Sequence, residues 1–191
     1  MVGSTRRGGR GARERLLAAA TVLFYRDGIH ATGVARLADV AQVSTRTFYQ
    51  HFPSKDALVT AYLTRLDSET AVPAEAQLLR EDLPPREKLL ALFADRPAEG
   101  IIRGCPFHNA AVEGAGTMPE VADVVRSHKN TFRARITAVA AEAGAADPEA
   151  LGRQLALLFE GARALATSLD DPAPLRDAHA TAATLIDHAV S

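Results

Sequence analysis

The sequence predicts an all-α fold in which a small basic helical domain precedes a larger helical domain. Apolar residues recur at the three-to-four-residue spacing of helices, and essentially no stretch alternates in the way that strands do. Turn residues and prolines divide these patterns into segments of helical length. The charge is uneven: residues 1–55 hold nine Lys or Arg and three Asp or Glu, which gives +6, and residues 56–191 hold thirteen and twenty, which gives −7.

The helices are expected in a definite order along the chain. Residues 13–26 carry an apolar stripe and stop before Gly28, because glycine suits the position that follows a helix. A longer helix is expected from Ser54 toward Ala71, and residues 100–116 are less regular. Prolines mark the remaining helices, which follow Pro84-Pro85, run from Pro119 to Gly144, begin at Asp147-Pro148, and follow Pro172 and Pro174.

Residues 32–58 have the pattern of a DNA-binding helix-turn-helix. Its first helix has an apolar stripe through Leu37, and Ser44 is suited to cap the second helix. The second helix is nearly all polar, apart from the buried side that Phe48 and Phe52 supply. Reading base edges and phosphates requires donors and acceptors on a short, rigidly held helix. The alternative is a helical hairpin without affinity for nucleic acid, which also occurs in all-α proteins.

The segment VSTRTFYQHFPSKDAL, residues 43–58, resembles the signature of the TetR family of transcriptional regulators. The shared features are a valine-capped turn, a Tyr-x-His-Phe end of the second helix and a following Ser-Lys pair. The resemblance extends over roughly residues 10–70. It implies a homodimer that binds a palindromic operator. It also implies a regulator, most simply a repressor, that a small molecule releases from the operator. The alternative is a sequence-blind architectural DNA-binding protein, which would not need so large an acidic helical domain.

The resemblance also assigns DNA-contacting residues by position. It implies that Thr45, Arg46 and Thr47 face the major groove. Phosphate contacts are implied for three residues at or after the end of the second helix, and Thr32 is expected to cap the helix before the turn. The complete predicted set is Thr32, Gly33, Gln42, Ser44, Thr45, Arg46, Thr47, Tyr49, Gln50, His51 and Lys55, of which Tyr49, His51 and Lys55 are the phosphate ligands.

Two positions depart from the family pattern. Gln42 stands at a turn position where many members have glycine, and a left-handed conformation there would cost roughly 1 kcal/mol. Gly33 stands where a hydroxyl residue is common, which removes one phosphate contact or lets the backbone approach DNA more closely. Neither change breaks the apolar pattern of the motif.

The domain boundaries follow from charge and motif. Residues 1–9 are expected to form a flexible basic arm, which either lies on DNA or is an ordinary solvated terminus. Residues 10–55 are the predicted helix-turn-helix domain, and residues 56–191 are the predicted ligand-binding and dimerisation domain. The family-type domain, which includes the linking helix, extends to about residue 70.

The second domain is expected to bind an unknown small, largely apolar effector. Aromatic and other apolar side chains would line the pocket, and a polar minority would orient the ligand. The alternative is that each aromatic residue is ordinary core. The predicted pocket residues are Leu89, Phe93, Cys105, Phe107, His108, Asn109, Met118, Phe132 and Phe159.

The last two helices are rich in alanine and leucine, and their apolar stripe is wide enough to pack against a second copy in a four-helix bundle. A dimer would place two recognition helices about a twofold axis, as a palindromic operator requires. The alternative is that both helices only close the core of the monomer. The predicted interface residues are Leu151, Leu155, Leu158, Ala162, Ala178, Ala182 and Leu185.

The sequence lacks the signatures of several other classes of protein. No phosphate-binding glycine loop, nucleophile elbow or zinc-ligand spacing is present, so we expect no enzyme, cofactor or metal site. No apolar run approaches membrane-spanning length, and a single cysteine suits a reducing cytoplasm. A thiol-dependent enzyme or sensor at Cys105 is the weakest alternative, because only Arg103 supplies positive charge nearby in sequence.

Overall fold

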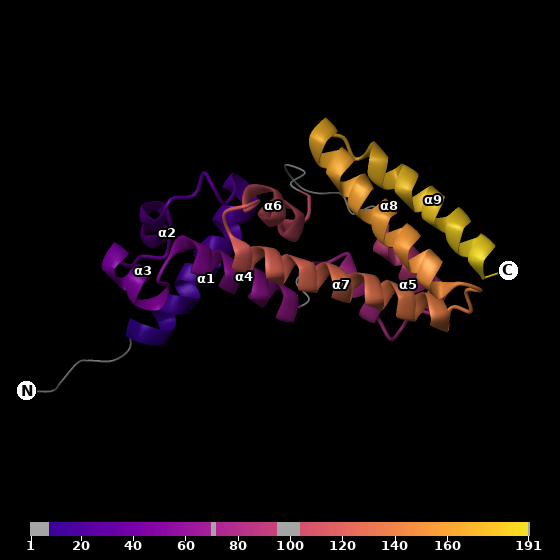
Figure 1. Ribbon diagram of the computed structural model, residues 1–191, viewed down its shortest axis with the longest axis horizontal. Helices are drawn as coiled ribbons and strands as arrows, with labels where there is room; N and C mark the ends of the chain where they lie inside the picture. The colour runs from indigo at the N-terminus through magenta and orange to yellow at the C-terminus, as the bar shows by residue number, and fades with distance from the viewer. Residues whose placement is uncertain (1–7, 70–71, 95–103, 191) are drawn as a thin grey trace, which may run out of the picture. The chain divides into compact units, whose positions relative to one another are not determined.

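The computed structural model describes residues 8–69, 72–94 and 104–190. Within these ranges all regular structure is helical and no strand occurs, which confirms the all-α prediction (Figure 1). The elements are α1 (Gly8–Asp27), α2 (Val34–Val40), α3 (Thr45–His51), α4 (Lys55–Ser68), the 3-10 helix η1 (Glu75–Leu79), α5 (Pro85–Leu92), α6 (Pro106–Glu113), α7 (Pro119–Glu142), α8 (Pro148–Leu169) and α9 (Ala173–Ala189).

The chain divides into two compact units that do not follow the expected boundary at residue 55. Among the described residues, unit 1 holds residues 8–65 and 106–125, and unit 2 holds the remainder. Two of the three divisions fall inside helices, since α4 and α7 each contribute to both units. Unit 1 therefore includes α6, which the sequence analysis left as an irregular part of the second domain.

Unit 1 is organised around α1, against which α2 and α3 pack (Figure 1). Leu16 and Ala20 of α1, Leu37 of α2 and Phe48 of α3 are fully buried. The helix begins at Gly8, five residues before the expected start, because Ala12 is only 2% exposed and extends the packed side of α1 toward the N-terminus. The predicted arm thus loses Gly8 and Gly9 to α1, and residues 1–7 lie outside the described residues.

The core of unit 2 is formed by α5, α7, α8, α9 and η1. Three aromatic rings meet within it: Phe159 lies 5.9 Å from Phe93 and 5.2 Å from Phe132, centroid to centroid. Helices α8 and α9 lie side by side along most of their length (Figure 1). Helices α7 and α8 approach so closely that a Cβ on Gly152 would collide with Thr137.

A buried ionic cluster ties together three elements of unit 2. His128 of α7 lies between Asp67 of α4, with Nδ1 2.8 Å from Oδ1, and Glu75 of η1, with Nε2 3.2 Å from Oε1. The side chains of His128 and Glu75 are 3% and 2% exposed. Burial lowers the pKa of His128, but hydrogen bonds to Glu75 and Asp67 more than compensate, so this pKa lies above its ordinary value of 6.5. Neither η1 nor this cluster was predicted from the sequence.

The local signals for helix ends are confirmed. Gly28 follows α1 with φ +94°, and Asp147 caps α8 by accepting the N–H of Ala150 at 2.9 Å. Ser54 in the same way accepts the N–H of Ala57 at 3.0 Å at the start of α4. No helix in the described part of the chain is sufficiently long and apolar to cross a bilayer.

Candidate nucleic-acid interface

The turn between α2 and α3 has the strained geometry that the sequence predicts. Gln42 adopts φ +53°, and its N–H donates to the carbonyl of Asp39 at 3.0 Å. The N–H of Val43 donates to the carbonyl of Ala38 at 2.9 Å, so the two bonds form the Schellman pattern that normally ends in glycine. The turn thus holds α3 in place although a glutamine occupies the glycine position.

Ser44 caps α3, as predicted. Its Oγ accepts the N–H of Thr47 at 3.0 Å and lies 2.9 Å from the hydroxyl oxygen of Thr47. This second contact keeps the Thr47 side chain at the helix start, where it is half-buried. Thr47 is therefore less available to a base edge than the sequence analysis assumed.

The outer face of α3 is polar and accessible. Its exposed residues are Thr45, Arg46, Tyr49 and Gln50, whereas His51 is half-buried. Arg46 makes no ion pair within the described part of the chain. Tyr49 is 53% exposed, and its ring packs edge-on against Phe48 at 5.2 Å between centroids. The packed side of α3 thus fixes the helix, and its outer face presents hydrogen-bond donors and acceptors.

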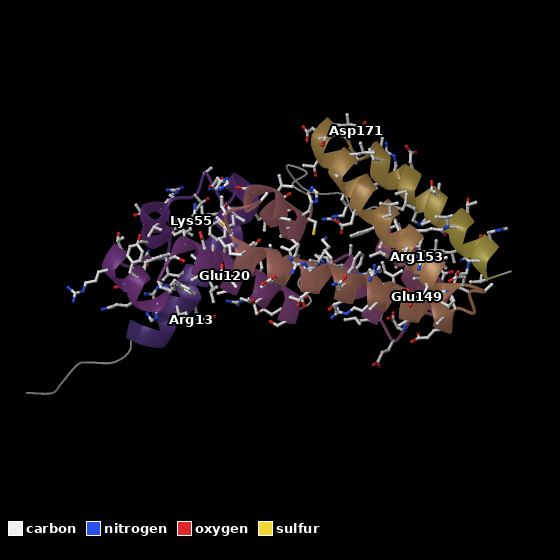
Figure 2. The ribbon with its side chains drawn as sticks, viewed as in Figure 1. Arg13, Lys55, Glu120, Glu149, Arg153 and Asp171 are labelled. Atoms are coloured by element: carbon white, nitrogen blue, oxygen red, sulfur yellow. The ribbon has the colours of Figure 1, made fainter. Side chains whose placement is uncertain are left out.

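Lys55 makes contacts within unit 1 that were not predicted. It begins α4 (Figure 2), and its Nζ donates to the backbone carbonyls of Ile29 at 3.0 Å and Thr32 at 3.4 Å. A lysine ammonium has three donors, and two of them are used within unit 1. Lys55 thus anchors the loop between α1 and α2. A DNA phosphate bound to Lys55 would share its ammonium group with the two loop carbonyls.

Thr32 does not cap α2, which corrects the expectation from the family pattern. The Thr32 residue is 2% exposed, and its hydroxyl donates to the carbonyl of Gly28 at 2.7 Å. The cap position belongs to Gly33, which has no side chain to accept a hydrogen bond from α2. Thr32 is therefore part of the loop interior in this structure, while Gly33 is exposed.

Three contacts that support the motif were missed because their partners are far apart in sequence. Arg15 of α1 donates from Nε to the carbonyl of Ala41 at 2.9 Å, at the end of α2. The guanidinium of Arg13, which is labelled in Figure 2, lies 5.4 Å from the centroid of the Phe52 ring. Glu113 of α6 accepts the N–H of His30 at 2.7 Å. Spacing along the chain gives no signal for such contacts.

The nine predicted pocket residues divide between the two units. Leu89, Phe93, Phe132 and Phe159 belong to the unit 2 core, and Cys105 is also buried in unit 2. The other four belong to unit 1, where two are buried, Asn109 is half-buried and His108 is exposed: Phe107, His108, Asn109 and Met118.

The predicted dimer residues are partly corrected. Leu151, Leu155 and Ala182 are at most 1% exposed and pack inside the core of unit 2, so they cannot form an outer face. An apolar groove of ≈ 590 Å³ instead lies along α8 and α9, and the other four predicted residues line it: Leu158, Ala162, Ala178 and Leu185.

The exposed leucines of α8 were not among the predicted interface residues. The groove lining also includes Leu157 and Leu165, which are 77% and 55% exposed, and Leu169 is 62% exposed nearby in sequence. Along the sequence these leucines fall between the core positions of α8. The apolar stripe of α8 therefore has one side that packs in the core and another side that is exposed. Sequence periodicity alone did not separate the two sides.

Within the described ranges, no group of three or more His, Cys, Asp or Glu residues could hold a metal ion. His128 has a carboxylate at each ring nitrogen, at 2.8 and 3.2 Å. Both nitrogens are therefore used in the ionic cluster.

Comparison with known proteins identifies both parts of the chain. Residues 16–62 match the family model for bacterial regulatory proteins of the tetR family, and residues 85–182 match that for a tetracyclin repressor-like C-terminal domain. The HTH-type transcriptional activator FasR of Mycolicibacterium smegmatis is 40% identical over 93 residues, and the HTH-type transcriptional repressor BdcR of Escherichia coli is 33% identical over 84. These matches cover 47% and 44% of this chain but only 42% of either relative.

Solved structures match over nearly the whole chain. A candidate TetR transcriptional regulator from Streptomyces avermitilis is 35% identical with a TM-score of 0.78, and the match covers 93% of this chain and 97% of that one. A TetR-family transcriptional regulator from Streptomyces coelicolor is 28% identical with a TM-score of 0.76, over 95% and 97% of the two chains.

Proposed function

The chain belongs to the TetR family of bacterial regulatory proteins, and on that premise we propose that it binds a palindromic operator as a homodimer and leaves it when a small, largely apolar effector binds. As a member of this family it is a DNA-binding transcriptional regulator and not an enzyme. The palindromic operator, the homodimer and the effector are proposals that go beyond family membership.

The observation that carries the operator proposal is the outer face of α3. Arg46, Tyr49 and Gln50 are exposed on a helix whose buried side, Phe48, is fully enclosed and whose start is capped by Ser44. A recognition helix needs rigid support on one side and free donors on the other. The charge of +6 over residues 1–55 favours phosphate at the same end of the sequence.

The dimer proposal rests on the groove along α8 and α9. Exposed leucines are costly in water, and burying one side chain contributes about 1.5 to 3 kcal/mol. A second copy that placed its own α8 and α9 against the groove would cover Leu157 and Leu165 symmetrically. We expect Leu157→Glu to give a monomer in light scattering. Val112→Glu is the matched control, because Val112 is 64% exposed in unit 1.

The effector proposal concerns the aromatic part of the unit 2 core. The two helices α4 and α7 contribute to both units, so a change of packing in unit 2 has a continuous helical path to unit 1. Release of DNA requires that the effector bind the DNA-free conformation more tightly than the DNA-bound one. A compound that raises the melting temperature but leaves operator affinity unchanged would count against this part.

We propose that the protein represses transcription. FasR is an activator and BdcR is a repressor, so the two relatives do not decide the sign. A reporter gene placed behind the selected operator is expected to be silenced by the protein. Higher expression in the presence of the protein would assign activation instead.

The experiment that tests the function is selection of duplexes from a random library by the purified protein. We expect an inverted repeat whose half-sites lie about one helical turn or slightly more apart, as two symmetry-related α3 helices require. The Leu157→Glu monomer should lose the selected duplex, and Val112→Glu should keep it. Enrichment of no sequence motif would favour the architectural alternative over an operator-binding regulator.

A further inference from the structure

We propose that the proton of His128 controls operator affinity: the charged imidazole holds the C-terminal end of α4 to α7, and loss of the proton releases that end. The effect on DNA rests on the proposed function. The release itself does not, because all the residues that take part in it belong to unit 2.

Helix α4 is held near both of its ends by polar contacts. Its first residue, Lys55, donates to the carbonyls of Ile29 and Thr32 in the loop between α1 and α2. Near its other end, Oδ1 of Asp67 lies 2.8 Å from Nδ1 of His128 on α7. The helix has 14 residues and is continuous, so the contact at Asp67 bears on the position of the helix-turn-helix domain.

Only the charged form of His128 can donate to both of its partners. Nδ1 faces Asp67 at 2.8 Å, and Nε2 faces Oε1 of Glu75 at 3.2 Å. A charged imidazole carries a proton on each nitrogen, whereas a neutral one carries a single proton. Loss of the second proton leaves a nitrogen lone pair against a carboxylate oxygen and removes the positive charge between two anions. One of the two contacts must then break.

The contact that breaks is the one to α4. The Asp67 side chain is 37% exposed, so water can replace His128 as its hydrogen-bond donor. The Glu75 side chain is 2% exposed, and a buried carboxylate that loses its donor is costly. The neutral imidazole therefore keeps its proton on Nε2 for Glu75, and Asp67 is released.

The charged groups around His128 place this release above pH 6.5. Burial opposes the charge on the imidazole, and so does Lys129 on the same helix, but the hydrogen bonds to Glu75 and Asp67 outweigh both. The pKa of His128 therefore lies above its ordinary value of 6.5. Asp67 is held at pH 6.5 and is released as the pH rises beyond the pKa of His128.

Release of α4 should weaken binding to the operator. In the proposed homodimer, two α3 helices must lie at a fixed separation to reach both half-sites. When α4 is held at both ends, fewer arrangements of the helix-turn-helix domain are open to the free protein, so less conformational entropy is lost on binding. We expect affinity to fall about fivefold between pH 6.5 and pH 8.5, which is the low end of typical coupling between sites.

Fluorescence anisotropy with the selected duplex, at constant ionic strength from pH 6.5 to 8.5, tests this effect. His128→Gln is neutral at every pH and should bind at pH 6.5 as weakly as the wild type does at pH 8.5. His188→Gln, which removes an exposed histidine of α9, is the matched control and should keep the pH dependence of the wild type. The histidines of unit 1 are the same in all three proteins. Equal pH dependence in the wild type and His128→Gln would overturn the proposal.

Asp67→Asn separates the proton from a loss of packing. Its amide oxygen can still accept from Nδ1 of His128, but the charge that favours the imidazolium is gone. The midpoint of the affinity profile should therefore move to lower pH. Glu149→Gln, which removes a carboxylate of α8 that is 70% exposed, should leave the midpoint in place. A purely structural role of Asp67 would lower affinity at every pH without moving the midpoint, and that result would count against the proposal.

Nuclear magnetic resonance of labelled histidines reports the protonation of His128 directly. If the proton favours DNA binding, then DNA binding must raise the pKa of His128 by the same factor, because coupling between two sites is reciprocal. An identical pKa with and without the duplex would overturn the effect on DNA. If the wild type binds no duplex, the proposed function fails together with that effect. The pKa of His128 in the free wild type and in free Asp67→Asn would still decide whether the proton holds α4.

Discussion

The two units of this protein use charged side chains in opposite ways. In unit 1, Arg46 is exposed on the outer face of α3 and makes no ion pair among the described residues. In unit 2, His128 and Glu75 are almost completely buried and bonded to each other. Exposed charge adds little to folding and stays available to a partner, whereas buried paired charge fixes the positions of the elements that carry it. Unit 1 therefore keeps an accessible cation on α3, and unit 2 buries a paired ionic cluster in its interior.

The largest effect should come from breaking the buried cluster. His128→Leu leaves Glu75 buried without its partner, and removing one member of such a pair typically costs about 3 to 5 kcal/mol. Chemical denaturation should show this loss in the free energy of unfolding. The control is Arg36→Ala in unit 1, whose pair with Asp39 spans 3.9 Å at side-chain exposures of 58% and 79%, and which should cost less than about 1 kcal/mol. Equal losses would contradict the contrast between the units.

The next effect concerns DNA and leaves stability unchanged. Arg46→Ala should relax the preference at one or two base pairs of the selected duplex by about 1 to 3 kcal/mol, without changing the melting temperature. Fluorescence anisotropy with single-base variants of the duplex measures this preference. Arg153→Ala is the control, since Arg153 is an exposed arginine of α8 whose nearest carboxylate, Glu149, is 4.0 Å away (Figure 2). Relaxed preference in Arg153→Ala, or none in Arg46→Ala, would contradict the assignment of α3 as the reader.

The buried cluster should also make stability depend on pH. The pKa of His128 is raised in the folded state, so the folded protein binds a proton more tightly than the unfolded chain. The resulting stabilisation is fully present below the ordinary pKa of 6.5 and is lost as pH rises through the higher folded-state pKa. Melting temperatures should therefore fall as the pH rises from about 6.5 through neutral pH. His128→Gln should flatten this part of the profile, and an unchanged profile would show that another group titrates.

The smallest effect is expected at the turn of the motif. Gln42→Gly removes the cost of φ +53° and should stabilise the protein by about 0.5 to 1 kcal/mol. Asp170→Gly is the matched comparison, since Asp170 has φ +49° at the end of α8 in unit 2. A loss of stability in Gln42→Gly would mean that the glutamine side chain makes a contact that offsets its strain.

The sequence predicted unit 1 better than unit 2 for a physical reason. The cap by Ser44, the strain at Gln42 and the burial of Phe48 involve residues within a few positions of each other, so local patterns determine them. The contact of Arg15 at the end of α2 and the contact of Lys55 with Ile29 join residues 26 positions apart, and neither was predicted.

In unit 2 the important contacts are nearly all long-range. The bonds of His128 join residues 61 and 53 positions apart, and Lys129 reaches Cys105 across 24 positions. Only Arg103 is a cation near Cys105 along the chain, so the contact of Lys129 with its sulfur could not be predicted from sequence spacing. The stripe on α8 was recognised, but its division between core and outer face depends on how the helix is rotated against α9, which periodicity does not determine.

Salt titration of DNA binding tests the central claim most directly. The affinity of the wild-type protein for the selected duplex is measured by fluorescence anisotropy at potassium chloride concentrations from about 50 to 200 mM. If the exposed cations of unit 1 replace counterions on phosphate, the logarithm of affinity falls linearly with the logarithm of salt, with a slope of about −0.9 per phosphate contact. Binding that does not change with salt, or no binding at the lowest salt, would contradict the account.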